Sequence, residues 1–295
     1  MGVLFVGLGT MGQPMVKRLS SSFEVTVYDI DGDARRRVAA ELGVPELPDL
    51  GDVPASIDTV VLMLPNSTIT ESVLTGASRL LNRIPAGGLI IDMTSSEPAS
   101  TRSLARVAAS RGVAYVDAPV SGGRRRAESG ELAIMVGADD SAYLRAHPIL
   151  ETMGARIVHV GGPGAGGAAK ALNNLLSATH IAAASEVLTA AAKLGIDPAI
   201  MLEVLNSSTG RSQATEVKFP EFVLSGSFAS GFGMDLMLKD LGIARRISEE
   251  AGVYMPVTGL AREITENARE GLEGSPDHTE VVRYYEARNG VTLRA

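Results

Sequence analysis

The spacing of apolar residues divides the chain into two parts that differ in predicted secondary structure. Up to about residue 160, short runs rich in valine, isoleucine and leucine alternate with stretches of helical periodicity. This alternation is typical of a parallel β-sheet with helices on both faces. The predicted strands are 3–6, 25–28, 59–63, 89–92, 114–116, 133–136 and 157–160, and the segments between them include predicted helices over 100–109 and 143–152.

The strand pattern disappears after the glycine-rich segment 161–164. Long amphipathic runs rich in alanine and leucine follow, and they predict helices. These helices are 168–194, 198–206, 236–251, 256–270 and a last one around 280–288. The chain is therefore predicted to form a doubly wound α/β domain over residues 1–162 and an all-helical domain over 163–295, which begins with a long interdomain helix.

The first predicted strand runs directly into Gly7-Leu8-Gly9-Thr10-Met11-Gly12, and apolar residues at helical spacing follow. In this strand–turn–helix context the first glycine allows a tight turn. The second lets the backbone approach a pyrophosphate, and the third lets the helix pack closely on the strand. The N–H groups at the start of the helix also favour phosphate binding. The first domain is therefore predicted to be a Rossmann-type dinucleotide-binding domain that binds its cofactor through these six residues.

The second predicted strand ends at Asp29, 22 residues after Gly7. A carboxylate at this place accepts hydrogen bonds from the adenosine ribose hydroxyls and repels a 2′-phosphate, which favours NAD. Arg35, Arg36 and Arg37 begin the next predicted helix. One of them could reach a 2′-phosphate, although a solvated helix face is the more common use of such residues. NAD is the expected cofactor, and NADP stays open.

Two further loops follow predicted strands at the edge where an open parallel sheet binds its ligands. Met63-Leu64-Pro65 closes one strand, and Thr94-Ser95 follows the end of the next. Hydroxyl groups here can bond the nicotinamide ribose or amide, and they can also cap the helix that begins near Pro98. We therefore expect the cofactor to contact both loops.

Composition narrows the classes of function. The 295 residues carry a formal net charge of −7, which gives no electrostatic reason to expect nucleic acid or an anionic membrane as a partner. The absence of cysteine excludes disulfides and thiolate metal sites, and the four histidines have no metal-ligand spacing. The first apolar run is too short for a signal peptide or a membrane-spanning helix. A cytoplasmic enzyme without a metal fits these features.

Lys170 and Asn174 lie one turn apart in an alanine-rich predicted helix that follows Gly164. Residues four apart share a helix face, so the ammonium and the carboxamide point the same way. A buried lysine is costly unless it is paired or used. The alternative is a lysine that extends to the surface from the start of the helix.

With these residues assembled, the chain resembles the β-hydroxyacid dehydrogenases, most closely the 3-hydroxyisobutyrate dehydrogenase branch. The resemblance covers nearly the whole chain and implies an NAD(P)-binding domain, a helical domain for substrate binding and oligomerisation, and assembly as a homodimer or homotetramer. It rests on the glycine turn at 7–12, Asp117-Ala118-Pro119-Val120-Ser121-Gly122-Gly123, Gly164-x-Gly166-x-x-x-Lys170-x-x-Asn173-Asn174, and Lys239-Asp240-Leu241.

The resemblance also implies roles for individual residues. Lys170 would be the catalytic residue, and Lys239 would lie where cofactor and substrate meet and contact both. Ser121, Gly122, Gly123 and Asn174 would hold the substrate. Residue chemistry agrees, because a hydroxyl and unobstructed N–H groups suit a carboxylate, and alcohol oxidation needs a hydride acceptor and a proton acceptor. Free lysine has a pKa of about 10.4, and we hypothesise that burial and a nearby cation lower it.

The chain departs from the family pattern in two places. Arg124, Arg125 and Arg126 follow Ser121-Gly122-Gly123, where relatives usually have smaller residues. They indicate either a solvated loop or a pocket mouth suited to a second anionic group on the substrate. Thr94-Ser95 also reverses the usual Ser-Thr order, which leaves the hydroxyl chemistry intact.

The expected reaction interconverts a small β-hydroxyacid such as 3-hydroxyisobutyrate and its semialdehyde or keto acid. Tartronate semialdehyde reduction, serine or phenylserine oxidation and succinic semialdehyde reduction stay open. Imine reduction is disfavoured because related imine reductases generally lack a lysine at position 170. A non-catalytic nucleotide sensor is disfavoured because Lys170, Asn174 and Lys239 are all present.

Overall fold

The computed structural model describes residues 2–76 and 79–294. The chain forms two compact units that divide after Lys170. The long helix α7 (Ala165–Lys193) belongs to the first unit at its start and to the second unit for the rest of its length.

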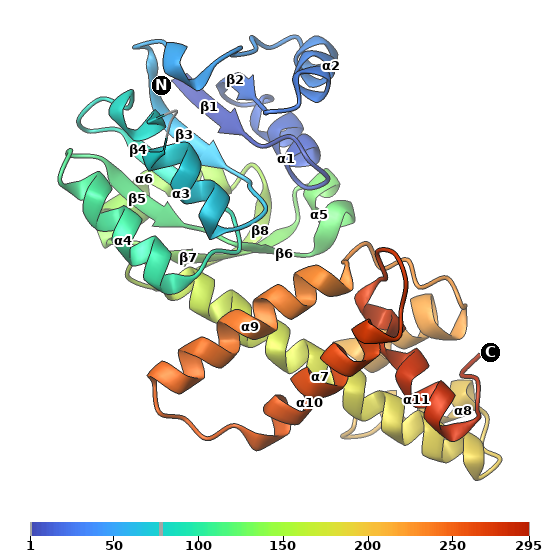
Figure 1. Ribbon diagram of the computed structural model, residues 1–295. Helices are drawn as coiled ribbons and strands as arrows, with labels where there is room; N and C mark the ends of the chain where they lie inside the picture. The colour runs from blue at the N-terminus through green and yellow to red at the C-terminus, as the bar shows by residue number, and fades with distance from the viewer. Residues whose placement is uncertain (1, 77–78, 295) are drawn as a thin grey trace. The chain divides into compact units, whose positions relative to one another are not determined.

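The first unit contains an eight-stranded sheet in the order β2-β1-β3-β4-β5-β7-β6, with β8 paired to β7 (Figure 1). Strands β1 to β5 are parallel, as predicted. Strand β7 runs antiparallel to β5 and β6, and β8 is parallel to β7. The strands are β1 (Gly2–Val6), β2 (Glu24–Tyr28), β3 (Ile57–Leu62), β4 (Leu89–Asp92), β5 (Ala114–Asp117), β6 (Val120–Ser121), β7 (Leu132–Gly137) and β8 (Gly154–Gly161).

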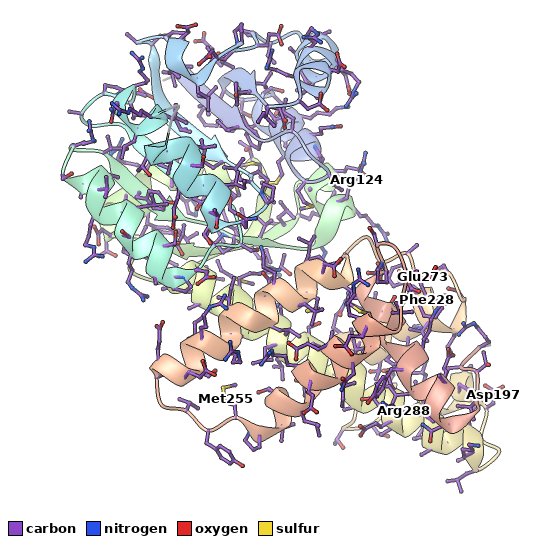
Figure 2. All side chains as sticks on the ribbon, in the orientation of Figure 1. Arg124, Asp197, Phe228, Met255, Glu273 and Arg288 are labelled. Carbon is purple, nitrogen blue, oxygen red and sulfur yellow. The ribbon has the colours of Figure 1, made fainter. Side chains whose placement is uncertain are left out.

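The prediction of a parallel sheet is therefore wrong for β7 and β8, and β6 was not predicted. After β5 the chain returns through β6 and the short helix α5 (Gly123–Ser129). A connection this short suits an antiparallel return, whereas a parallel one needs a full crossover. Arg124 lies at the start of α5 (Figure 2).

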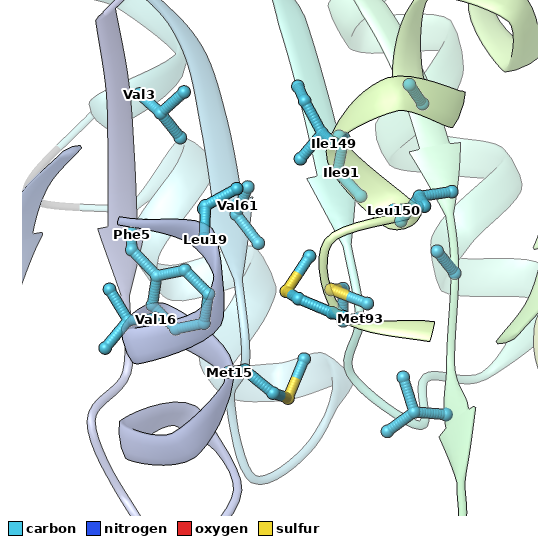
Figure 3. Packing of buried hydrophobic residues seen from close by; sticks show 14 of the residues in the cluster. Val3, Phe5, Met15, Val16, Leu19, Val61, Ile91, Met93, Ile149 and Leu150 are labelled. Carbon is cyan, nitrogen blue, oxygen red and sulfur yellow. The ribbon is translucent and has the colours of Figure 1, made fainter. Parts of the chain in front are cut away.

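Helices cover both faces of the sheet. Successive residues of β1 point to opposite faces, so Val3 and Phe5 join one apolar cluster and Leu4 and Val6 join another. The first cluster, drawn in part in Figure 3, includes residues of α1 (Gly12–Leu19), α2 (Gly32–Leu42) and α6 (Asp140–Leu150). The second includes residues of α3 (Ser67–Thr75), α4 (Pro98–Ala109) and the 3₁₀ turns η1 (Leu50–Asp52) and η2 (Leu80–Asn82). This burial of both faces explains why the strands read as continuous apolar runs.

The regular secondary structure of the second unit is helical over its described residues, apart from one isolated bridge between Gly233 and Asp277. All five predicted helices are observed, and their ends agree within three residues, the usual scatter of helix boundaries. Ile181 and Leu188 of α7 form its core with Phe219, Val223 and Val282. The further elements are α8 (Pro198–Asn206), η3 (Ala214–Leu224), α9 (Met234–Glu250), α10 (Pro256–Glu270), η4 (His278–Val281) and α11 (Val282–Asn289).

The π-helix η3 was not predicted. It contains Pro220, which lacks an N–H and disfavours the interior of an α-helix. The wider turn of a π-helix also places its buried residues off the 3.6-residue period. The apolar residues of this segment therefore do not show the periodicity of an α-helix.

Helix α7 is long and apolar enough to cross a membrane by length and composition, although the sequence had indicated no spanning helix. In the structure 56% of its apolar segment is buried. Ile181 and Leu188 are buried in a cluster with residues of α8, η3, α9, α10, η4 and α11. Its apolar character is therefore that of a core helix.

Candidate active site

The glycine turn after β1 leaves its backbone open at one position. Gly7 has a φ of +101°, and a Cβ added there would lie 2.2 Å from the Met63 carbonyl oxygen. A Cβ on Gly12 would lie 1.9 Å from the Gly7 carbonyl oxygen, whereas one on Gly9 would meet nothing within 4 Å. Gly7 and Gly12 are therefore required by packing, and Gly9 leaves space for a ligand. This is the geometry that a pyrophosphate needs.

Asp29 ties the end of β2 to the glycine turn. Its Oδ2 accepts a hydrogen bond from the Leu8 N–H at 2.6 Å, and its Oδ1 accepts one from the Asp31 N–H at 2.8 Å. Gln13 supports the same turn, because its Nε2 donates to the Leu8 carbonyl at 2.8 Å. The carboxylate predicted to bind the adenosine ribose therefore also positions the phosphate-binding loop.

The glycine turn and Asp29 line one surface cavity of about 340 Å³. Among the arginines considered for a 2′-phosphate, only Arg37 lines it. Arg35 bonds Glu46 at 2.9 Å, and Arg36 bonds Asp33. The described lining does not include the other residues predicted to bind the cofactor, which are Gly7, Met11, Gly12, Met63, Leu64, Pro65, Thr94, Ser95 and Lys239. The lining consists of Leu8, Gly9, Thr10, Gln13, Asp29, Asp31, Ala34, Arg37 and Arg124.

The loops after β3 and β4 are joined through Thr94. Its Oγ1 accepts a hydrogen bond from the Leu64 N–H at 3.1 Å, and its own N–H donates to Asp92 Oδ1 at 3.0 Å. The interpretation of Thr94 as a cap for α4 is wrong, because that helix begins after Glu97 without a side-chain cap. Thr94 is buried, whereas Ser95 remains half-exposed.

Asp92 is a buried organising residue that was not predicted. Besides the Thr94 N–H, its carboxylate accepts hydrogen bonds from the Tyr115 hydroxyl at 2.9 Å and from Ser96 Oγ at 3.3 Å. Burial raises the pKa of Asp92, and the hydrogen bonds from Thr94, Tyr115 and Ser96 oppose that rise. The available signal was an acidic residue that ends an otherwise apolar strand.

Asp117 is a second buried carboxylate, and it fixes the start of α7 by hydrogen bonds. Its Oδ1 accepts a hydrogen bond from the Gly164 N–H at 2.7 Å, and its Oδ2 accepts one from the Gly167 N–H at 2.9 Å. The side chain is buried, and burial raises its pKa to about 6 against these two hydrogen bonds. Asp117 lay within a quoted motif but received no role from the sequence.

Glycines let the start of α7 approach the sheet this closely. A Cβ on Gly166 would lie 2.4 Å from the Met135 carbonyl oxygen, and one on Gly167 would lie 2.8 Å from the Ser96 carbonyl oxygen. The first turn of α7 is therefore fixed on β5, β7 and the loop after β4. Lys170 follows on the next turn and is only 6% exposed. The alternative of a lysine extended to the surface is wrong.

In the second unit, Asp240 organises the predicted substrate residues. Asn174 is buried, and its Nδ2 donates to Asp240 Oδ2 at 2.6 Å. Lys239 Nζ lies 3.5 Å from Asp240 Oδ1. The carboxylate thus fixes the carboxamide of Asn174 and pairs with the neighbouring ammonium. The sequence placed Asp240 in a motif without giving it this role.

Ser121, Gly122 and Gly123 lie where β6 passes into α5. Gly122 and Gly123 have positive φ values of +131° and +66°, which favour glycine. A Cβ on Gly122 would lie 2.6 Å from Arg126 Cδ, whereas one on Gly123 would meet nothing within 4 Å. The backbone at Gly123 is therefore open to a ligand, and the stem of Arg126 lies beside Gly122.

Comparison with known proteins gives family matches over both parts of the chain. Residues 2–161 match the family described as the NAD binding domain of 6-phosphogluconate dehydrogenase. Residues 164–285 match the family described as NAD-binding of NADP-dependent 3-hydroxyisobutyrate dehydrogenase. The chain belongs to the β-hydroxyacid dehydrogenase family. The family predicted from the four motifs is thereby confirmed, together with its two-part fold.

Relatives resemble this β-hydroxyacid dehydrogenase along nearly its whole length. The 2-(hydroxymethyl)glutarate dehydrogenase of Eubacterium barkeri is 41% identical over 98% of this chain and 96% of its own. The 3-hydroxyisobutyrate dehydrogenase of Pseudomonas aeruginosa is 35% identical, over 89% and 90% of the two chains. The solved structure of Mycobacterium tuberculosis 3-hydroxyisobutyrate dehydrogenase with L-serine is 32% identical, with a TM-score of 0.87 over 96% and 98%. The protein is accordingly an NAD(P)-dependent oxidoreductase that acts on the CH–OH group of a small hydroxyacid.

Substitutions at two glycines of the turn should have different effects, one on stability and the other on cofactor binding. Gly12→Ala should lower the free energy of unfolding by roughly 1–3 kcal/mol, because the methyl group overlaps the Gly7 carbonyl. Gly9→Ala should leave stability within about 0.5 kcal/mol but weaken NADH binding at least about tenfold. Thermal unfolding and titration calorimetry measure the two effects. Unchanged NADH affinity in a folded Gly9→Ala protein would contradict this assignment.

Asp117 should make stability depend on pH. Its folded pKa of about 6 exceeds the ordinary value of 3.8, so the folded state holds the proton more tightly. The free energy of unfolding should therefore fall as pH rises from about 4 to 6, by at most about 3 kcal/mol. Asp117→Asn cannot titrate and should be less stable throughout, since its amide NH₂ would face one of the two N–H donors that now bond the carboxylate. The stability gap between wild type and variant should narrow over this pH range, and a constant gap would count against the shift.

Proposed function

We propose that this dehydrogenase oxidises a 2-substituted 3-hydroxypropanoate, HO–CH₂–CH(R)–COO⁻, to its semialdehyde, with NAD as the hydride acceptor. The compounds named for its relatives share this unit. R is a carboxyethyl group in 2-(hydroxymethyl)glutarate, a methyl group in 3-hydroxyisobutyrate and an ammonium group in L-serine. Tartronate semialdehyde reduction also fits, with R as a hydroxyl group. The proposed substrate class therefore consists of acids that carry a CH₂OH group on the carbon next to the carboxylate.

The observation that carries the mechanism is the buried amine of Lys170, which follows a helix start fixed to the sheet by Asp117. In its neutral form Lys170 accepts the hydroxyl proton during oxidation, and its ammonium returns that proton during reduction. Bound NAD would supply the hydride acceptor for the carbon that bears the hydroxyl group. The buried position excludes bulk water from the amine, so the proton passes between lysine and substrate.

Other residues of the chain bind and orient the substrate. The Ser121 hydroxyl and the N–H groups at Gly122 and Gly123 hold its carboxylate. We assign the Asn174 carboxamide, which Asp240 fixes, as a further substrate ligand and Lys239, paired with the same carboxylate, as a residue that contacts substrate and cofactor. Asp29 binds the ribose hydroxyls, and its charge beside that of Asp31 favours NAD over NADP.

A second candidate is a preference for a substrate whose R group is anionic. Arg126 lies beside Gly122 of the proposed carboxylate grip, and the relative with 41% identity is named for a dicarboxylate. A guanidinium at this position would bind a second carboxylate in a bidentate manner. Arg126→Ala should then lower kcat/KM for 2-(hydroxymethyl)glutarate far more than for 3-hydroxyisobutyrate.

We also propose a cytoplasmic homodimer or homotetramer with no nucleic acid or membrane partner. Apolar side chains of the second unit are exposed on α7 and α8, including Leu172, Leu176, Ile200 and Val204, and a second subunit would cover such residues. We place the functional boundary at 162/163, between the spans of the two family matches.

Replacing Lys170 should remove the chemistry and leave cofactor binding intact. Lys170→Ala should lower kcat by roughly 100- to 10,000-fold. Lys170→Arg should fail similarly, because guanidinium does not deprotonate near neutral pH. Stopped-flow absorbance of NADH gives the rate, and calorimetry gives the NADH dissociation constant. A Lys170→Ala enzyme that keeps most of its activity and its NADH affinity would refute the role.

A substrate panel tests the proposed class. NADH formation is expected with 3-hydroxyisobutyrate, L-serine, glycerate or 2-(hydroxymethyl)glutarate, at a kcat/KM at least about tenfold above that with NADP. The matched control is 4-hydroxybutyrate, whose alcohol lies one carbon further from the carboxylate and should not react. Turnover of 4-hydroxybutyrate alone, or of none of the β-hydroxyacids, would overturn the proposal.

A further inference from the structure

The short helix α5 places an arginine at the dinucleotide-binding turn. Arg124 is more than a hundred residues away from the glycine turn in sequence, yet it lines the same cavity as Leu8, Gly9 and Thr10. It also lines an adjacent cavity of about 270 Å³ with Gln13, Lys17 and Glu128, where α5 packs against α1. Figure 2 labels Arg124 at this corner of the first unit. Its presence there does not follow from the strand–turn–helix motif.

The residues that line both cavities show where Arg124 lies within the larger one. Gln13 and Arg124 line both. The Gln13 amide donates to the Leu8 carbonyl, so this shared side lies at the glycine turn. Leu8, Gly9 and Thr10 line only the larger cavity, as do Asp29, Asp31, Ala34 and Arg37, whereas Val38, Glu41 and Leu42 of α2 line only the smaller one. Arg124 therefore lines the larger cavity beside Gln13, whose side chain is bonded to the glycine turn, and the open backbone of Gly9 in the same cavity suits a pyrophosphate.

The guanidinium is available for a strong anion. Its Nε donates to Glu128 Oε1 at 2.8 Å. Within residues 2–76 and 79–294, nothing accepts a hydrogen bond from its two terminal nitrogens. The two side chains are 59% and 53% exposed, and exposed ion pairs contribute little to stability. A dianionic ligand can therefore compete for the arginine, whose planar fork matches phosphate oxygens.

We propose that Arg124 binds the pyrophosphate of the dinucleotide, opposite the N–H groups of the glycine turn. Its guanidinium would contact the phosphate oxygens from α5, the helix that follows the predicted substrate-binding residues Ser121, Gly122 and Gly123. The 2′-phosphate of NADP is the other phosphate that this cavity could receive. There it would meet the carboxylates of Asp29 and Asp31, which repel it, and the guanidinium of Arg37, which attracts it. The assignment concerns the cofactor alone, so it stands or falls independently of the proposed substrate class.

The test compares dissociation constants for NADH and NADPH in the full-length protein without substrate. The variants are Arg124→Ala, Arg124→Lys and the matched control Arg125→Ala. Arg125 is the exposed neighbour on the same helix and lines neither cavity. Titration calorimetry provides the affinities, and circular dichroism melting confirms that each variant is folded.

Arg124→Ala should weaken NADH and NADPH binding by the same factor, about tenfold. Arg124→Lys should give an intermediate loss, because it keeps the charge and lacks the fork. Arg125→Ala should change both affinities by less than about twofold. A loss confined to NADPH would move the contact to the 2′-phosphate and overturn the proposal. Unchanged affinities, or an equal loss in Arg125→Ala, would also overturn it.

Discussion

The two hydrogen bonds that Asp117 accepts from the first turn of α7 fix the helix start on which Lys170 follows. They run from the N–H groups of Gly164 and Gly167 to a carboxylate buried at the end of β5. A helix start has N–H groups without intrahelical partners and a partial positive charge, so a buried carboxylate both satisfies and is stabilised by it. This interaction fixes the first turn of α7 on the sheet. It thereby sets the position of Lys170.

The same principle recurs at the other strand ends of this unit. Asp29 directly follows β2 and bonds the glycine turn through the Leu8 N–H, and Asp92 ends β4 and bonds the following loop through the Thr94 N–H. Each carboxylate is partly or fully removed from water and accepts hydrogen bonds from a neighbouring loop. A buried or half-buried carboxylate thus fixes each of these loops through a hydrogen bond to its backbone. The positions of the binding groups depend on these acids as much as on the ligand-facing residues.

Glycine is used here for two distinct physical reasons. At Gly7, Gly12 and Gly166 a side chain would overlap a carbonyl oxygen, so glycine allows two backbone segments to touch. At Gly9 and Gly123 the space beside the backbone is open, so glycine leaves room for a ligand. The sequence motifs contain both kinds without distinguishing them. Only the neighbours brought by folding separate a packing glycine from a binding one.

The sequence by itself determined the elements that depend on local pattern. Apolar runs and helical periodicity gave β1 to β5 and the five long helices, and the glycine turn with Asp29 gave the cofactor class. Four ordered motifs gave the family and the candidate Lys170. Tertiary structure alone decided the antiparallel run of β7, the roles of Asp92, Asp117 and Asp240, and the place of Arg124 beside the glycine turn. These features join residues far apart in the chain. Such contacts depend on how the elements pack. The residue periods of strands (2.0) and helices (3.6) predict which face of an element is buried, but not which distant backbone group a buried side chain contacts.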